Sequence, residues 1–158
     1  MVSLVFGDGV GSIFFCGGNS SFRERTRWFR SKMNQAESVA IERPDGWRAS
    51  FTLSEGPITG VLASPSGDEN PFNLTPIQSG TIAGLYEARG SCGLLGLIVA
   101  HPSREATPVG QGACVGDGAL IEQVNPIAPI GLTAQGTILV EVAGSTEEVQ
   151  LPPSVPHL

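Results

Sequence analysis

The chain has 158 residues, enough for one domain of ordinary size with a short extension and a sound hydrophobic core. Its charged content of 15% is well below the globular average, and its 21 glycines and 12 prolines favour short strands and tight turns over helices. A net charge of -6 argues against general nucleic-acid binding, and no apolar run is long enough to predict a transmembrane helix.

Residues 1–35 are predicted to form an N-terminal extension. The first part is apolar but interrupted by glycines, and residues 20–35 have the pattern of a short basic amphipathic helix with Ser20 or Ser21 as its N-cap. Most basic residues of the chain lie in this helix: Arg23, Arg25, Arg27, Arg30 and Lys32, the only lysine. The composition is typical of a transit segment, and also of a chain whose true start is Met33.

Trp28 and Phe29 lie beside these arginines and could contact a nucleic acid or a membrane surface. Because the basic run is short, a solvated helix face held by two aromatic anchors is the simpler interpretation. We therefore expect neither a nucleic acid nor a membrane as a partner.

Residues 36–63 are predicted to form a β-hairpin region. The turn sequence Arg43-Pro44-Asp45-Gly46 lies between two runs with strand alternation, which predicts a hairpin over residues 38–53. The apolar positions at period two are Val39, Ile41, Trp47, Ala49, Phe51 and Leu53. A further strand is predicted over residues 58–63. Residues 64–73 are rich in Pro, Ser, Gly, Asp and Asn, which predicts a linker and a domain boundary.

Residues 74–151 are predicted to form a second domain made of strands, followed by a tail over residues 152–158. The uniformly apolar run over residues 94–100 fits a strand buried on both faces. The other expected strands are residues 80–87, 118–123, 126–132, 137–142 and 148–151. Positive backbone φ angles are expected at Gly116, Gly136 and Gly144.

The three cysteines, Cys16, Cys92 and Cys114, are odd in number and have no C-x-x-C spacing. We therefore expect buried or incidental thiols in a reducing compartment, with no disulfide framework and no zinc site. His101 and His157 have no partner at a metal-ligand spacing.

A catalytic motif is not visible in the sequence. Asp117 and Glu122 could face a common cleft, but two acids near a turn are usually solvated. We therefore predict that the chain is not an enzyme and carries no cofactor.

Several motifs occur in the order found in one family. Residues 75–82 read T-P-I-Q-S-G-T-I, residues 134–138 repeat the ending as A-Q-G-T-I, and Glu122-Gln123-Val124-Asn125 lies between them. This pattern resembles the biotinyl/lipoyl attachment domain, and in particular the biotin carboxyl carrier protein of acetyl-CoA carboxylase. The resemblance implies a barrel-sandwich hybrid of two similar halves, with a pair of four-stranded sheets and the modified lysine at an exposed hairpin tip.

In this chain Asn125 stands where the resemblance places the modified lysine. An asparagine carboxamide is not nucleophilic, so a ligase cannot acylate it. The Met-Lys-Met triplet is absent, one residue is missing between Gly116 and Glu122, and the chain is longer than bacterial carrier proteins over residues 87–101. The alternative is that Asn125-Pro126 forms an ordinary hairpin turn in an unrelated β protein.

A closer resemblance is to plant plastid proteins with a biotin-attachment-like domain that lacks the lysine. Ile121-Glu122-Gln123, Pro129-Ile130 and Gly136 match their spacing, and residues 151–156 are similar to their proline-rich ending. These relatives are implied to be non-catalytic subunits that replace the true carrier in a carboxylase.

By this resemblance we expect a non-biotinylated, regulatory or structural subunit of an acyl-CoA carboxylase in the cytoplasm or a plastid. Its partners would be carboxylase subunits. The interaction hairpin would consist of Glu122, Gln123, Val124, Asn125 and Pro126.

The alternative hypothesis is a virion or assembly protein, such as a capsid decoration or tail component, that contacts identical or capsid subunits. Small, glycine-rich β domains with little charge serve such roles through exposed loops and edge strands.

Overall fold

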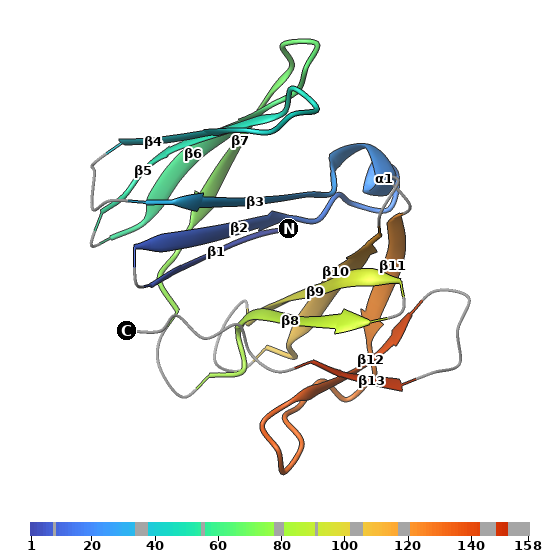
Figure 1. The fold of residues 1–158 in the computed structure, drawn as a ribbon. Helices are drawn as coiled ribbons and strands as arrows, with labels where there is room; N and C mark the ends of the chain where they lie inside the picture. Colours follow the sequence, from blue (N-terminus) through green and yellow to red (C-terminus); the bar gives the residue numbers. More distant parts are fainter. Residues whose placement is uncertain are drawn as a thin grey trace. The chain divides into compact units, whose positions relative to one another are not determined.

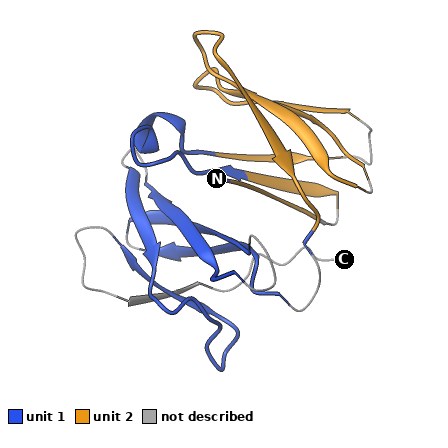
Figure 2. Cartoon of the chain, turned by 180° about the vertical axis from the view of Figure 1, so that it is seen from behind, with its two compact units in different colours: residues 1, 14–27, 77–155 blue, residues 2–13, 28–76, 156–158 orange. Residues whose placement is uncertain are grey.

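A computed structural model describes residues 1–7, 9–33, 38–54, 56–77, 81–90, 92–101, 106–116, 121–142 and 148–151. The protein is mainly β, with 59% strand and 3% helix, as the composition predicts (Figure 1). The chain divides into two compact units (Figure 2). Within the described ranges, no helix has the length and apolarity needed to cross a membrane.

One unit comprises residues 2–13 and 28–76 and holds a four-stranded antiparallel sheet in the order β4-β5-β6-β7. Its strands are β4 (Ser38–Glu42), β5 (Arg48–Thr52), β6 (Ile58–Ala63) and β7 (Glu69–Leu74). A three-stranded sheet has the order β1-β2-β3 and also lies largely in this unit. Its strands are β1 (Val2–Gly7), β2 (Val10–Phe15) and β3 (Arg27–Lys32).

The predicted hairpin over residues 38–53 is confirmed. β4 and β5 pair antiparallel, the Arg43 amide donates to the Trp47 carbonyl at 2.9 Å, and Gly46 has a φ of +82° in the turn. Ile41, Ala49 and Phe51 are buried on one face, as their alternation predicts. The strand predicted over residues 58–63 is also present, as β6.

The predicted N-terminal extension is wrong, because residues 1–35 contribute three strands to the fold. The expected helix over residues 20–35 is only α1 (Phe22–Arg25), with Ser21 at its N-cap, and the following residues form β3. Phe29 on β3 and Met33, which directly follows the strand, are both buried. A short apolar run can form a strand or a helix, and here β-sheet pairing decides the outcome.

The predicted linker over residues 64–73 is also wrong. Its first half is a tight turn in which the Asp68 amide donates to the Ser64 hydroxyl at 3.0 Å and Gly67 has a φ of +93°. Its second half is the edge strand β7, which tolerates Pro71 because an edge strand leaves some amides unpaired. In this part of the chain, the boundary between the units instead falls between Pro76 and Ile77.

The other unit holds a six-stranded antiparallel sheet in consecutive order from β8 to β13. Its strands are β8 (Gly84–Gly90), β9 (Gly93–Ala100), β10 (Val109–Val115), β11 (Ile121–Pro126), β12 (Ile138–Val142) and β13 (Glu148–Leu151). The first and last strands contact each other, so the sheet curls into a half-barrel. This single meander differs from the pair of four-stranded sheets implied by the resemblance.

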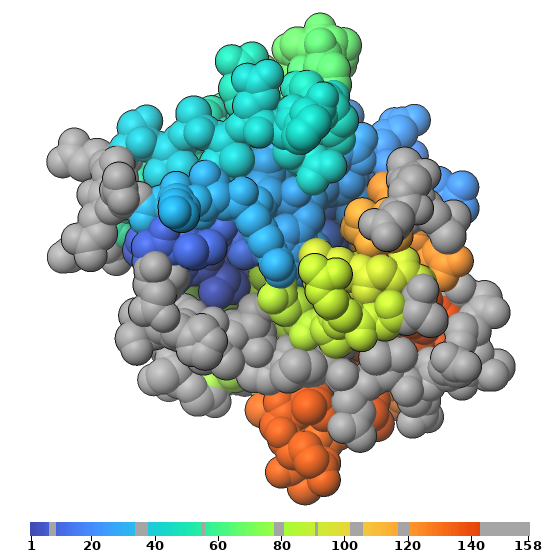
Figure 3. All heavy atoms as spheres, in the orientation of Figure 1, coloured from blue at the N-terminus to red at the C-terminus, as the bar shows by residue number. Residues whose placement is uncertain are grey.

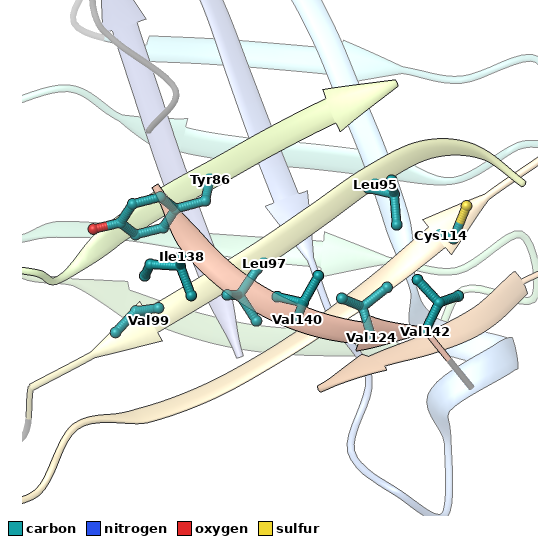
Figure 4. Close-up of a cluster of buried hydrophobic side chains, with 9 residues drawn as sticks. All are labelled: Tyr86, Leu95, Leu97, Val99, Cys114, Val124, Ile138, Val140 and Val142. Atoms are coloured by element: carbon teal, nitrogen blue, oxygen red, sulfur yellow. The ribbon is translucent and has the colours of Figure 1, made fainter. Parts of the chain in front are cut away.

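The inner face of the curled sheet carries the core of this unit (Figure 4). The cluster consists of Tyr86, Leu95, Leu97, Val99, Cys114, Val124, Ile138, Val140 and Val142. On β12 the buried residues alternate with the half-buried Leu139 and the exposed Glu141, so one face of the strand lies in the core.

β9 is buried on both faces, as its apolar run predicts. Leu97 lies in the inner core, and Ile98 on the opposite face is only 4% exposed. On that opposite face the Gln111 side chain of β10 donates to the Gly17 carbonyl at 2.6 Å, so the segment after β2 covers part of the sheet.

Several strand boundaries differ from the sequence predictions. β10 was not expected, because its two interior glycines weaken the strand pattern. Residues 127–132 form no strand, although one was predicted over residues 126–132. Gly136 has the expected positive φ of +74°, and Gly144 lies outside the described residues.

The two glycines of β10 allow close strand packing. A Cβ added at Gly112 would lie 2.3 Å from the Gly96 carbonyl oxygen, which belongs to the backbone of β9 and cannot rotate away. We expect Gly112→Ala to lower the free energy of unfolding by roughly 1–3 kcal/mol. Urea unfolding of Gly112→Ala beside Gly18→Ala, whose added Cβ meets nothing within 4 Å, measures this. Equal stability of the two variants would contradict the packing.

Candidate functional site

The predicted interaction hairpin, Glu122 to Pro126, is a strand and not a hairpin tip. These residues belong to β11, which pairs with β10 on one side and β12 on the other. Asn125 faces Glu141 of β12 in the ladder. β10 pairs with residues 121–124 and β12 with residues 124–126, so each residue of the segment has a ladder partner on at least one side.

The two faces of β11 have different roles. Val124 is 0% exposed in the core cluster, so it is not available to a partner. Asn125 is exposed on the other face, where its side-chain oxygen accepts a hydrogen bond from the Gln123 amide at 3.1 Å. Glu122, Gln123 and Pro126 are half-buried.

The surface of β11 therefore presents amide groups beside one carboxylate. Gln123 and Asn125 offer hydrogen-bond donors and acceptors, and Glu141 opposite Asn125 is also exposed. These groups can form hydrogen bonds with another protein surface, but a carboxamide supplies no nucleophile. Asp117, the other acid considered for a shared cleft with Glu122, lies outside the described residues.

Two substitutions test whether residues 122–126 form a central strand or an exposed hairpin tip. We expect Val124→Ala to lower the free energy of unfolding by about 2 kcal/mol, because two buried carbons are lost from the core. Asn125→Ala should change it by less than about 0.5 kcal/mol, as is usual for an exposed side chain. Thermal or urea unfolding of the two variants checks this, and a Val124→Ala variant as stable as Asn125→Ala would contradict the strand.

A disulfide joins Cys92 and Cys114, which corrects the expectation of three free thiols. Cys92 lies in the turn between β8 and β9, and Cys114 is in β10, 22 residues further along the chain. The Cα atoms are 6.1 Å apart, within the ordinary range for a bridge. In the chain-entropy model such a crosslink stabilises the fold by about 3 kcal/mol.

Cys16 is a free thiol and is 2% exposed. Burial raises its pKa to about 11, although the amino terminus and Thr26 act in the opposite direction. The Thr26 hydroxyl is itself fixed, because it donates to the Phe22 carbonyl at 2.6 Å and accepts from the Gly17 amide at 3.2 Å. Cys16 therefore stays protonated at neutral pH and is a poor nucleophile.

The raised pKa of Cys16 makes stability depend on alkaline pH. Below pH 9 the Cys16 thiol is protonated in both the folded and the unfolded chain, so its titration does not lower the free energy of unfolding. Between pH 9 and about 11 the unfolded chain loses this proton first, so stability falls, by about 2–3 kcal/mol at pH 11.

Urea unfolding from pH 8 to pH 11 measures this effect, with Cys16→Ala as the reference. We expect the wild-type protein to lose more stability over this range than Cys16→Ala, whatever the variant's stability at pH 8. Parallel pH profiles would show that Cys16 does not titrate with a raised pKa.

A shallow depression of about 340 Å³ lies on the four-stranded sheet. It is lined by Ser38, Ser50, Phe51, Thr52, Thr59, Gly60 and Val61. The lining offers hydroxyl groups and small apolar surfaces, and none of these side chains is an acid or a base at neutral pH. In the described part of the chain, no three His, Cys, Asp or Glu residues gather where a metal ion could bind.

Comparisons of this chain with protein-family models, with curated proteins and with solved structures find no match.

Proposed function

We propose that this protein is a non-catalytic structural component that assembles with other protein subunits outside a reducing cytosol. The assembly hypothesis, with a virion or other extracytoplasmic particle as its setting, is favoured over a carboxylase subunit. The single observation that supports this choice is the Cys92–Cys114 disulfide.

The redox state of Cys92 and Cys114 separates the two hypotheses. Glutathione and thioredoxin keep cytosolic thiols reduced, whereas disulfides persist in secreted proteins, in the periplasm and on virion surfaces. A carboxylase subunit in the cytoplasm or a plastid would therefore be expected to hold Cys92 and Cys114 as thiols. Cys114 is 1% exposed and Cys92 packs against the same core cluster, so the bridge is part of the interior of its unit.

The sheets of this protein also offer surfaces suited to assembly. β4 and β7 end one sheet, and β1 and β3 end another. An edge strand presents backbone donors and acceptors that another chain can pair with. The exposed Asn125 and the half-buried Gln123 on β11 provide a second polar surface.

The carboxylase-subunit hypothesis is our second candidate. The observation in its favour is that Asn125, at the position of the carrier lysine in the resemblance, is exposed at the surface. In that case the protein would carry no biotin and would act by occupying a carrier's binding place.

Material purified from the native host under non-reducing conditions tests the proposal. After denaturation and alkylation, we expect one modified thiol, Cys16, without reductant and three with reductant. Native mass measurement and negative-stain microscopy should show a repeating particle or a defined assembly containing this chain.

Three alkylated thiols without reductant, or co-purification with a biotin-dependent carboxylase, would overturn the proposal. A streptavidin blot adds an independent check. Biotin on Lys32, which is exposed on β3, would show that the chain is itself a carrier.

A further inference from the structure

Among the described strands, β4 is a sheet edge without the usual protection against pairing. Among the described strands it has a partner only on the β5 side. Its residues, Ser38-Val39-Ala40-Ile41-Glu42, include no lysine and no proline, which are the usual devices that keep an edge from pairing.

The other edges differ from β4. β3 carries the exposed Arg30 and Lys32, and β7 contains Pro71 and also contacts β1. β8 and β13 contact each other within their own unit. β4 is therefore the edge most open to another strand, and its hairpin contributes to the surface seen in Figure 3, in cyan.

The backbone direction of β4 follows from its pairing with β5. The Arg43 amide donates to the Trp47 carbonyl at 2.9 Å, so Arg43 directs its backbone groups toward the β5 side. In an antiparallel ladder this direction alternates with every residue. Val39 and Ile41 therefore bond to β5, whereas Ser38, Ala40 and Glu42 direct their N–H and C=O groups to the open side.

We propose that β4 pairs antiparallel with β4 of a second copy of this chain, about a two-fold axis at Ala40. This inference deepens the proposed function by naming one partner. In this register Ala40 faces Ala40 of the second copy, and Ser38 faces Glu42 of the second copy. All three residues direct their backbone groups outward, so the pair forms about six backbone hydrogen bonds.

The side chains of β4 are complementary to themselves in this register. Val39, which is half-buried in one chain, meets Ile41 of the second copy and extends the row that begins at Phe51. The alanines at the axis are small and exposed, so the strands can approach without a clash. Glu42 meets a serine hydroxyl and not another acid, which avoids like-charge repulsion. The two sheets would join into one continuous sheet, and a two-fold axis makes the contact closed.

Cysteine crosslinking at the axis tests the pairing. We expect Ala40→Cys to form a disulfide-linked dimer in a buffer of oxidised and reduced glutathione, scored on a non-reducing gel. The matched control is Thr52→Cys, which is exposed on the same face of β5, one strand away from the edge. Its crosslinking should be at least roughly tenfold slower, because the two copies of residue 52 are too far apart to bridge.

A second variant removes the two hydrogen bonds at the two-fold axis without changing the chain's own ladder. Ala40→Pro deletes an N–H that points to the open side, so β4 keeps its bonds to β5. We expect Ala40→Pro to sediment as a monomer at concentrations where the wild-type protein and Ala40→Ser associate. Urea unfolding of each variant shows that the monomer is folded.

Ala40→Cys crosslinking no faster than Thr52→Cys, or a folded Ala40→Pro variant that associates like the wild-type protein, would overturn the pairing. Either result leaves the disulfide and the assembly in the native host untouched. Conversely, three free thiols or a carboxylase complex would overturn the proposed function while leaving the crosslinking result intact.

Discussion

The unit that holds β8 to β13 depends on one constraint, which is that apolar side chains fill the inner face of its curled sheet. Leu95, Leu97, Val124 and Val140 are completely buried on its inner face, each from a strand of the meander. Burial of such side chains is the main favourable term in folding, and it fixes which face of each strand turns inward. A shift of one residue in β11 would place Asn125 in the core and Val124 in water.

The same constraint decides what β11 can do. Because Val124 is fixed inside, Asn125 and Gln123 are fixed outside, where their amides are hydrogen-bonded to each other. The strand is paired with β10 over residues 121–124 and with β12 over residues 124–126, so its outward side chains are the groups that it offers to a partner. At β4 the situation is reversed, because the backbone of an edge strand is itself available. The protein thus has two kinds of polar surface, which are the amide side chains of β11 and the backbone edge of β4. Both can form hydrogen bonds with another protein.

The chemical state of each buried cysteine depends on the residue that the fold places beside it. Cys16 and Cys114 are both deeply buried, yet Cys16 is a protonated thiol beside Thr26 and Cys114 is bridged to the β8–β9 turn. The difference lies in the neighbour that the fold supplies. The disulfide also shifts the balance between the two functional hypotheses, because a bridge within a core belongs to an oxidising environment more readily than to a cytosolic carboxylase.

Local signals determined several elements directly. The Pro-Asp-Gly turn and alternating apolar residues specify the β4–β5 hairpin, and the uninterrupted run in β9 specifies a strand buried on both faces, because both patterns depend only on neighbouring residues. Mainly β architecture follows in the same way from the glycine and proline content. None of these requires knowledge of what lies far away in the chain.

Other features of the structure depend on contacts between segments that are far apart in the chain. Residues 27–32 have a pattern that fits a helix, but pairing within the β1-β2-β3 sheet makes them a strand. The composition of residues 69–73 predicts a linker, but pairing with β6 makes them part of β7. The Cys92–Cys114 pair depends on two strands meeting across 22 residues of chain. The placement of Asn125 within a strand likewise depends on β10 and β12. Each of these outcomes rests on a contact between distant segments, and such contacts leave no periodic trace in the sequence of either segment alone.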